Sequence, residues 1–321
     1  MKKFTKVCLT TALVLFLVGL MLCVVCGVLG GFRQLSRMDG IIDVGDIDVG
    51  DIGDLERKLK ELDGKQEELP LTAETLGSLE IDLEMCNLLI QESADEHVWY
   101  LAAGNTHRPR YTIENDGDRS RLCIENEADG WHRWRGKPND TVYLWLPKDC
   151  TLKACDIDIG AGYVKSISLQ AERARITIGA GLLEMNGLAG KDIILSADAG
   201  ELLAGRVTAE TAVLQIGAGH LRVEELAVSR EADIDVSVGQ CEIAGTITGD
   251  LALDCDMGEA VMRLTGSEDD HSYDVECGMG EVNVGGYSHS GVASERSWNS
   301  GKDSEFEIDC NMGTVTVTFE K

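Results

Sequence analysis

Apolar and polar residues alternate along the C-terminal half of the chain, and a glycine interrupts the alternation at nearly constant intervals. The glycines are Gly162, Gly181, Gly200, Gly219, Gly239, Gly258, Gly280 and Gly313, which gives intervals of 19, 19, 19, 20, 19, 22 and 33 residues. Self-similarity at a short fixed period is typical of repeat architectures. The pattern therefore predicts an array of coils of about 19 residues each.

Three apolar columns precede the glycines, at five, three and one positions before each of them. Position −5 holds Ile157, Ile176, Leu195, Leu214, Ile234, Leu253, Val275 and Ile308. Position −3 holds Ile159, Ile178, Ala197, Ile216, Val236, Cys255, Cys277 and Cys310. Position −1 holds Ala161, Ala180, Ala199, Ala218, Val238, Met257, Met279 and Met312. Polar residues or glycine occupy the positions between them, so each segment is predicted to be a strand that faces the core at −5, −3 and −1.

The alternation shifts by one residue at each glycine, because the next inward position is +2. That column holds Val164, Leu183, Leu202, Leu221, Cys241, Ala260, Val282 and Val315. A shift of this kind predicts a bulge or corner, where a residue without Cβ can adopt a positive φ. Two short strands cannot bury a core alone, so the coils must stack. The predicted fold class is all-β, a single-chain β-solenoid of about 19-residue coils preceded by one transmembrane helix.

An earlier coil is expected at residues 79–90, where Cys86 takes the glycine position 76 residues before Gly162. Residues 7–30 are 24 residues without a charge, long enough to span a bilayer core of about 30 Å. A cleavable signal peptide would have a shorter apolar core and a small-residue cleavage site. The segments predicted along the chain are a cytoplasmic N-terminus (1–6), a transmembrane helix (7–30), an acidic stalk or linker (31–71), first coils with an irregular cap region (72–147) and regular β-solenoid repeats (148–321).

The chain carries 29 Lys and Arg against 56 Asp and Glu, a net charge of −27. Such a charge repels nucleic acid, so no nucleic-acid partner is expected. The lipid bilayer is the expected partner of residues 7–30. Basic residues before that segment place the N-terminus in the cytoplasm and the solenoid outside the cell. The predicted localisation is thus a single-pass protein of the cell membrane, exposing an extracellular solenoid.

Candidate chemistry is sparse. The Gly-x-Gly turns lack the third glycine and the following helix of a dinucleotide site, and the six histidines have no ligand spacing. Cys255, Cys277 and Cys310 are expected to pack in the core, with a disulfide between coils or a metal site as alternatives. An outward acidic row (Asp254, Asp256, Glu276 and Asp309) is interpreted as a solubilising face, with Ca²⁺ binding as the alternative. The segment WHRWRGKP, Trp131 to Pro138, is read either as a cap of the stack or as a ligand contact.

Four features together resemble the bacterial putative-adhesin family, a group of β-solenoid domains of unknown function. They are the alternating strands, the edge LWLPKDCTL with Leu144 and Pro147, the repeated IGAG turns, and the closing FEIDCNMGTVTVTF. The likeness covers about residues 72–321. It implies a surface domain behind a membrane anchor, linked to adhesion or envelope stress, and it carries no catalytic residues. The interval SHSGVASERSWNSGKDS departs from the repeat and is expected to be a surface loop.

The sequence therefore predicts a membrane-anchored binding or structural module for adhesion or cell-envelope sensing, and no enzyme. No catalytic, cofactor-binding or metal-binding residue is predicted, and no cofactor. A glycan, the cell wall or a protein is the expected class of ligand. Two alternatives stay open: a solenoid enzyme that processes polysaccharide, and a regulatory scaffold that faces the cytoplasm.

Overall fold

The computed structural model describes residues 65–104, 109–126, 140–290 and 294–320. The predicted N-terminus and transmembrane helix, and the stalk as far as residue 64, lie outside these ranges, as does the segment Trp131 to Pro138. Within them, no helix is long and apolar enough to cross a membrane.

The described chain is almost entirely strand, which confirms the predicted all-β class. The strands are β1 (Glu67–Thr72), β2 (Leu76–Met85), β3 (Asn87–Glu92), β4 (His97–Ala103), β5 (Arg110–Asp116), β6 (Arg119–Asn126), β7 (Thr141–Leu146), β8 (Thr151–Ala189), β9 (Asp192–Ile247), β10 (Asp250–Thr265), β11 (His271–Cys277), β12 (Glu281–Val284), β13 (Tyr287–Ser290), β14 (Ser294–Trp298), β15 (Ser304–Cys310) and β16 (Thr314–Glu320). One 3₁₀ turn, η1 (Glu268–Asp270), joins β10 to β11. All strands belong to one 16-stranded sheet.

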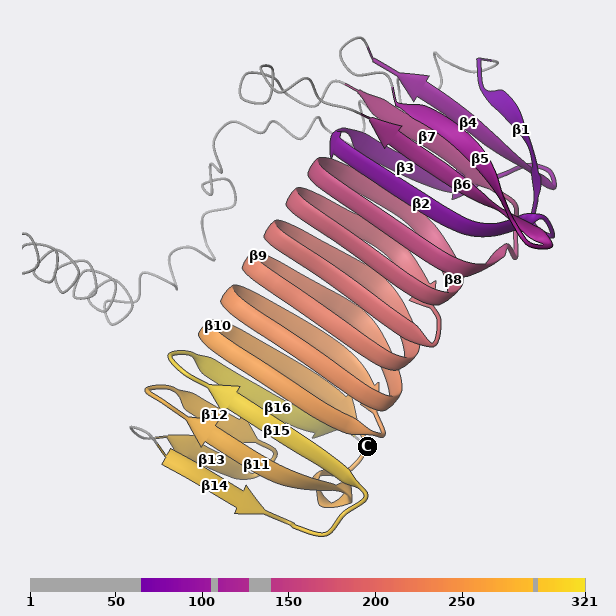
Figure 1. Ribbon diagram of the computed structural model, residues 1–321. Helices are drawn as coiled ribbons and strands as arrows, with labels where there is room; N and C mark the ends of the chain where they lie inside the picture. The colour runs from indigo at the N-terminus through magenta and orange to yellow at the C-terminus, as the bar shows by residue number, and fades with distance from the viewer. Residues whose placement is uncertain (1–64, 105–108, 127–139, 291–293, 321) are drawn as a thin grey trace, which may run out of the picture. The chain divides into compact units, whose positions relative to one another are not determined.

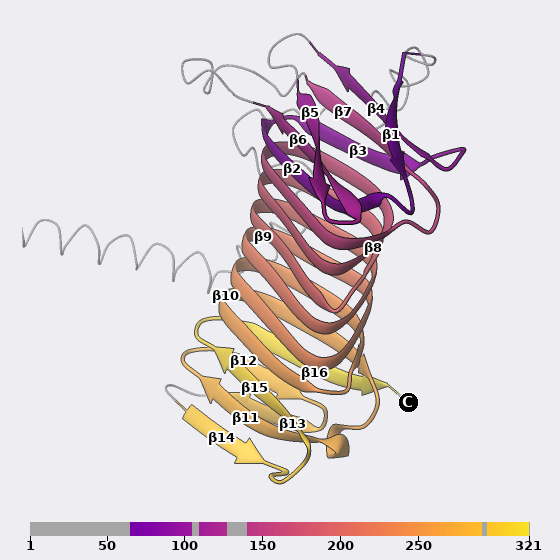
Figure 2. The same cartoon turned by 45° about the vertical axis from the view of Figure 1, so that its right-hand side comes forward.

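Strands β8 and β9 are long because they run through several coils without a break, whereas β10 forms a single further coil. Each coil pairs in parallel with the next (Figures 1 and 2). The register joins like positions of successive repeats, such as Ile176 to Leu195 and Gly181 to Gly200. Every residue at −5, −3 and +2 is buried. The core is therefore a set of apolar columns enclosed by the two faces of a solenoid-like stack.

The corner glycines from Gly162 to Gly239 are required by both their backbone angle and their surroundings, and Gly258, Gly280 and Gly313 by their surroundings. Gly181 and Gly200 have φ values of 131° and 134°, which side-chain-bearing residues rarely adopt. A Cβ added at Gly200 would clash with the carbonyl oxygen of Gly181 in the coil below. Cys86 takes this place in the first coil, where its N–H donates to Ala161 O at 3.1 Å. The predicted corner is thus confirmed, and it also sets how closely two coils approach.

The prediction that position −1 faces the core is wrong. The alanines there are only partly covered or exposed, and the exposed fractions reach 38% at Val238, 41% at Met257 and Met312, and 63% at Met279. Positions −2 and −1 are both partly covered or exposed, so the inward alternation already ends at position −3. Alternation in sequence could not reveal this, because an alanine or methionine satisfies the apolar pattern on either side of a corner.

The C-terminal coils do not stack in chain order. Strand β15 lies between β10 and β11 and pairs in parallel with both, and β16 lies in the same way between β10 and β12. In Figure 1 the yellow β15 and β16 are seen between β10 and the orange β11 and β12. The last coil of the sequence is thus the second-to-last coil of the stack.

The N-terminal end repeats this arrangement. Strands β2 and β3 form the predicted early coil, and β8 pairs with them on one side. On their other side lie β6 and β7, which come later in the sequence. The predicted irregular region therefore contains a further coil. The predicted stalk also ends earlier than residue 71, because β1 pairs with β4 and buries Leu69 and Leu71. Pro70 lies between these two leucines on this edge strand, where a missing N–H is tolerated.

Antiparallel strands cover both ends of the stack. At the N-terminal end β5 pairs with β6, and β4 pairs with β7. At the C-terminal end β14 pairs with β11, and β13 pairs with β12. The segment expected to be a surface loop, residues 288–304, supplies part of this second cap. Short antiparallel edges of this kind discourage further strand addition.

We predict that Gly200→Ala destabilises the protein more than Gly266→Ala does. Both glycines have a positive φ, 134° and 137°, but a Cβ at Gly266 would meet nothing within 4 Å. The backbone strain of about 1 to 3 kcal/mol is shared by both variants, and the clash with Gly181 should add about 2 kcal/mol for Gly200→Ala alone. Urea unfolding followed by circular dichroism measures the difference. Equal losses would show that coil spacing does not depend on the glycine column.

Candidate binding surface

The C-terminal coils carry a row of carboxylates that share one register position. Asp235 pairs with Asp254, Asp254 with Asp309, Asp309 with Glu276, and Glu276 with Glu295. Five neighbouring strands therefore place an acid side by side, at the strand spacing of about 4.8 Å. We call this set the acidic row. The sequence predicted three of its members, Asp254, Glu276 and Asp309. Asp309 lies between the other two, because β15 is inserted between β10 and β11.

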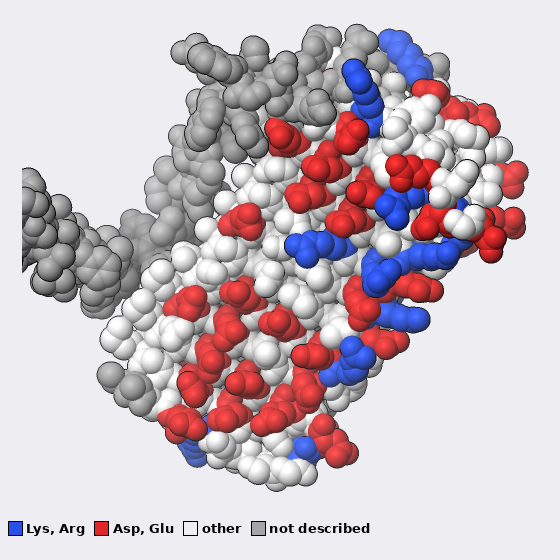
Figure 3. All heavy atoms as spheres, in the orientation of Figure 1, with Lys and Arg blue, Asp and Glu red and all other residues white. Residues whose placement is uncertain are grey.

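Further carboxylates flank the acidic row on the same face. Glu307 and Asp274 are register partners on β15 and β11, and Asp233 lies next to Ala252 on the neighbouring coil. Figure 3 shows that acidic side chains gather over the C-terminal coils on this side. Where the chain is described, none of the five row carboxylates forms an ion pair with Lys or Arg. The face therefore presents a concentrated negative charge that no Lys or Arg among the described residues neutralises through an ion pair.

The pKa values respond to this crowding. Partial burial, followed by the charges of Asp309 and Asp235, raises the pKa of Asp254 above its usual 3.8. Burial and the neighbouring Glu276 raise the pKa of Asp309 in the same way. The Asp309 Oδ1 atom is buried and has no hydrogen-bond partner. Ionising this face costs free energy, and a bound cationic group would recover part of it.

An apolar stripe runs along the corner beside the acidic row. Val238 pairs with Met257, the N–H of Met312 donates to Asp256 O at 2.7 Å, and the N–H of Met279 donates to Asn311 O at 2.6 Å. These contacts give the stack order Val238, Met257, Met312, Met279, and all four side chains are exposed. We call them the methionine stripe. Methionine is flexible and polarisable, and it suits surfaces that adapt to a partner.

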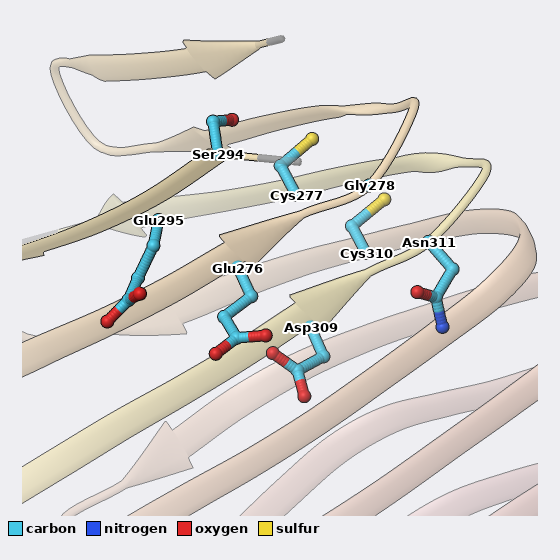
Figure 4. Close-up of a pocket in the computed structure, with 8 residues that line it drawn as sticks. All are labelled: Glu276, Cys277, Gly278, Ser294, Glu295, Asp309, Cys310 and Asn311. Atoms are coloured by element: carbon cyan, nitrogen blue, oxygen red, sulfur yellow. The ribbon is translucent and has the colours of Figure 1, made fainter. Parts of the chain in front are cut away.

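A pocket of about 330 Å³ opens where these features meet the C-terminal cap. Residues 276–278, 294–295 and 309–311 line it. Figure 4 shows the carboxylates of Glu276, Glu295 and Asp309 pointing to the same side of the sheet, while the thiols of Cys277 and Cys310 point away from them. Glycoside hydrolysis requires two carboxylates on opposite sides of the scissile bond. The described lining offers carboxylates on one side alone, which does not suit that reaction.

The other candidate sites named from the sequence either have structural roles or lie outside the described residues. The corner glycines lead from strand to strand, which is unlike a phosphate-binding loop. His271 is buried against Phe306, with ring centroids 4.1 Å apart, and its Nδ1 lies 2.8 Å from Ser304 Oγ. Burial lowers the pKa of His271 below 6.5, so this histidine packs as a neutral ring. Among the described residues no His, Cys, Asp and Glu form a metal-binding cluster. Trp131 to Pro138 stays a prediction, because it lies outside them.

Sequence reasoning missed an aromatic cluster at the C-terminal cap. Trp298 stacks on Tyr273 at 4.8 Å and lies 5.2 Å from Tyr287, measured between ring centroids. The Arg296 guanidinium lies 5.5 Å from the Tyr287 ring centre and 5.8 Å from the Trp298 ring centre. The alternation of Arg296 and Trp298 within SERSW was the available signal. These side chains cover the open end of the core.

Comparison with known proteins gives the same picture of the fold. A family model described as Toastrack DUF4097 matches residues 77–318, most of the chain. The chain belongs to the Toastrack DUF4097 family. This assignment confirms the resemblance to a family of unknown function that the IGAG turns and the closing strand indicated. No curated protein matches the sequence of this Toastrack chain.

Several solved structures are similar to the Toastrack chain at low identity. One is a putative cell adhesion protein from Clostridium sporogenes, with 14% identity over 79% of this chain and 99% of that one, and a TM-score of 0.24. Another is a putative adhesin from Parabacteroides distasonis, with 12% identity over 79% and 98%, and a TM-score of 0.33. A third, a putative lipid binding protein from the same organism, has 12% identity over 80% and 96%, and a TM-score of 0.32.

We predict that Asp309→Asn stabilises the protein at pH 7. A carboxyl whose folded pKa is raised contributes stability that is present at low pH and is lost as the pH rises through that pKa. The amide removes the charge, so the gain over the parent chain should be about 0.5 kcal/mol at pH 7 and should vanish near pH 4. Urea unfolding at both pH values tests this. Asp118→Asn removes a charge from an exposed turn and should give no gain; a loss of stability in Asp309→Asn at pH 7 would contradict the prediction.

Proposed function

We propose that this Toastrack chain is a membrane-anchored surface module that binds its partners through the outer faces of its coils, without catalysis. Its role would be adhesion or sensing of the cell envelope. The observation that carries the proposal is the acidic row, in which five carboxylates on adjacent strands face outwards without an ion pair among the described residues. The family assignment and the adhesin names of similar structures support the same class of function.

The chemistry of the surface indicates the kind of partner. The acidic row attracts positive charge, and the methionine stripe beside it offers exposed apolar area. A partner that carries both cationic and apolar groups would satisfy both, as a basic segment of an envelope protein does. The in-register spacing matters here, because a ligand with evenly spaced amines could pair with several carboxylates at once. Separately, a face of this charge favours rapid encounter with cationic partners at low salt.

We predict that a synthetic Lys-Leu peptide binds the full-length chain, purified in a mild detergent, and that neutralising the acidic row weakens the binding. The variant carries Asp235→Asn, Asp254→Asn, Asp309→Asn and Glu276→Gln. At about 0.5 kcal/mol for each exposed pair, affinity should fall about 30-fold and its salt dependence should decrease. Calorimetry or surface plasmon resonance measures both.

The matched control for this experiment removes four charges from exposed sites outside the acidic row. It carries Glu74→Gln, Asp116→Asn, Asp118→Asn and Glu210→Gln. Its affinity should change by less than threefold if position rather than net charge decides the binding. Equal weakening in both variants would show non-specific attraction, and no binding by the parent chain would refute a cation-binding face.

We also predict that the domain lies outside the cell. A cysteine introduced at Gly50 should react with a membrane-impermeant maleimide on intact cells, above the background of the parent chain. The same variant in permeabilised cells gives the full signal for comparison. Reaction after permeabilisation alone would place the domain in the cytoplasm, in agreement with the scaffold alternative.

A further inference from the structure

Three buried thiols lie side by side in the last three coils of the stack. Cys255 on β10 pairs with Cys310 on β15, and Cys310 pairs with Cys277 on β11. All three are at most 2% exposed, and their thiols are free. Register partners on adjacent strands lie about 4.8 Å apart, within the Cα separation that a disulfide allows. Cys310 is the middle member and therefore has a thiol neighbour on either side.

Contacts with the corner glycines show how the sulfur atoms are directed. Cys255 Sγ lies 3.2 Å from the position a Cβ would take at Gly313, in the same coil as Cys310. Cys310 Sγ lies 2.8 Å from the corresponding position at Gly280, in the coil of Cys277. The absent side chains of these two glycines make room for the sulfurs. Cys255 thus leans towards the coil of Cys310, and Cys310 leans towards the coil of Cys277. The contact between the Cys255 and Cys310 thiols favours these two as a pair.

The pocket at the C-terminal cap lies beside this column of thiols. Cys310 and Cys277 belong to its lining, whereas Cys255 does not. In Figure 4 the sulfurs of Cys277 and Cys310 lie on the same side of the sheet. Cys310 is therefore nearer than Cys255 to a reagent in the pocket, and its buried thiol, which points to the other side of the sheet, reacts when the end coils open locally.

We propose that Cys310 and Cys255 are a redox modification site that forms a disulfide between neighbouring coils under oxidising conditions. Cys310 is the attacking thiol and Cys255 the resolving thiol. The Cys255 thiol donates to Cys310 Sγ, and together with the N–H groups of Gly313 and Glu281 it lowers the pKa of Cys310 to about 7. The same contact and burial raise the pKa of Cys255. Cys310 is thus the more readily ionised thiol of the two, and the thiolate is the form that attacks a disulfide.

The reaction balances with a small disulfide such as oxidised glutathione as the oxidant. The Cys310 thiolate attacks one sulfur of that disulfide, forms a mixed disulfide and releases one glutathione thiolate. Cys255 then gives its proton to solvent, attacks Cys310 Sγ and releases the second glutathione. Two protein thiols lose two electrons and two protons in total, and the small disulfide gains the electrons.

The bond would fasten the coil that is inserted out of chain order. Strands β11 to β14 lie between Cys255 and Cys310 in the sequence, so the closed loop contains the whole C-terminal cap. Closing a loop of this length restricts the unfolded chain and stabilises the folded one. The unfolding temperature should rise by about 10 °C on oxidation.

The test uses the full-length chain in detergent, incubated with reduced or oxidised glutathione and then alkylated after unfolding. We expect oxidation to remove two thiols, to yield a linked peptide pair containing Cys255 and Cys310, and to raise the unfolding temperature, all reversed by dithiothreitol. An unchanged thiol count in the folded chain would overturn the proposal.

Three variants decide the pairing. Cys255→Ala should lose the thermal shift, and alanine is tolerated in this column because Ala197 occupies it in another coil. Cys277→Ala should keep the shift. Cys241→Ala is the matched control, since Cys241 is equally buried but pairs with Ala260, and it should also keep the shift. Loss of the linked peptide in Cys277→Ala, with retention in Cys255→Ala, would assign the bond to Cys277 and refute the pairing.

Discussion

Every coil of this protein depends on backbone hydrogen bonds to the coils on both sides, and the corner glycines set the distance at which those bonds form. From Gly162 onwards, a Cβ at these corners would collide with the carbonyl oxygen of the neighbouring coil, so this part of the stack is possible because its corners lack side chains. The same dependence creates a difficulty at each end, where one set of backbone groups has no coil to pair with. Both ends solve it with short antiparallel strands, and both place a coil out of chain order beneath them.

Much of the repeat could be predicted from the sequence, because burial imposes a period on it. The columns at −5, −3 and +2 are buried as the alternation indicated, and Cys86 occupies the corner of the early coil. Position −1 was misjudged because a strand pattern continues through a corner where the chain has already turned. The inverted order of the last two coils was also hidden, because Gly280 and Gly313 have the same local pattern. The 33-residue interval between them was the available sign of additional strands between these two coils in the sequence.

The candidate binding surface follows from the same regularity that builds the core. Parallel coils in strict register stack equivalent residues, so an inward column becomes continuous packing and an outward column becomes a continuous stripe of one chemistry. In the acidic row, partial burial and, after it, repulsion between neighbouring carboxylates raise the pKa of Asp254 and Asp309. The sequence revealed several of these acids, but their neighbours on the sheet depend on the coil order. The stacked coils thus hold the carboxylates of the acidic row at fixed positions on the surface.

The insertion of the C-terminal coil between two earlier ones also bears on synthesis. A ribosome delivers β11 and β12 before β15 and β16, yet the earlier pair has its parallel partners only in the later one. β11 and β12 can pair with the antiparallel strands β14 and β13 as these emerge, but their other edge must stay open until β15 and β16 have been made. A chain cut short after residue 303 would leave two rows of backbone groups open, one on β10 and one on β11 and β12. The fold therefore depends on β15 and β16 to cover these edges. A product truncated before them would carry exposed strand edges that proteases can recognise.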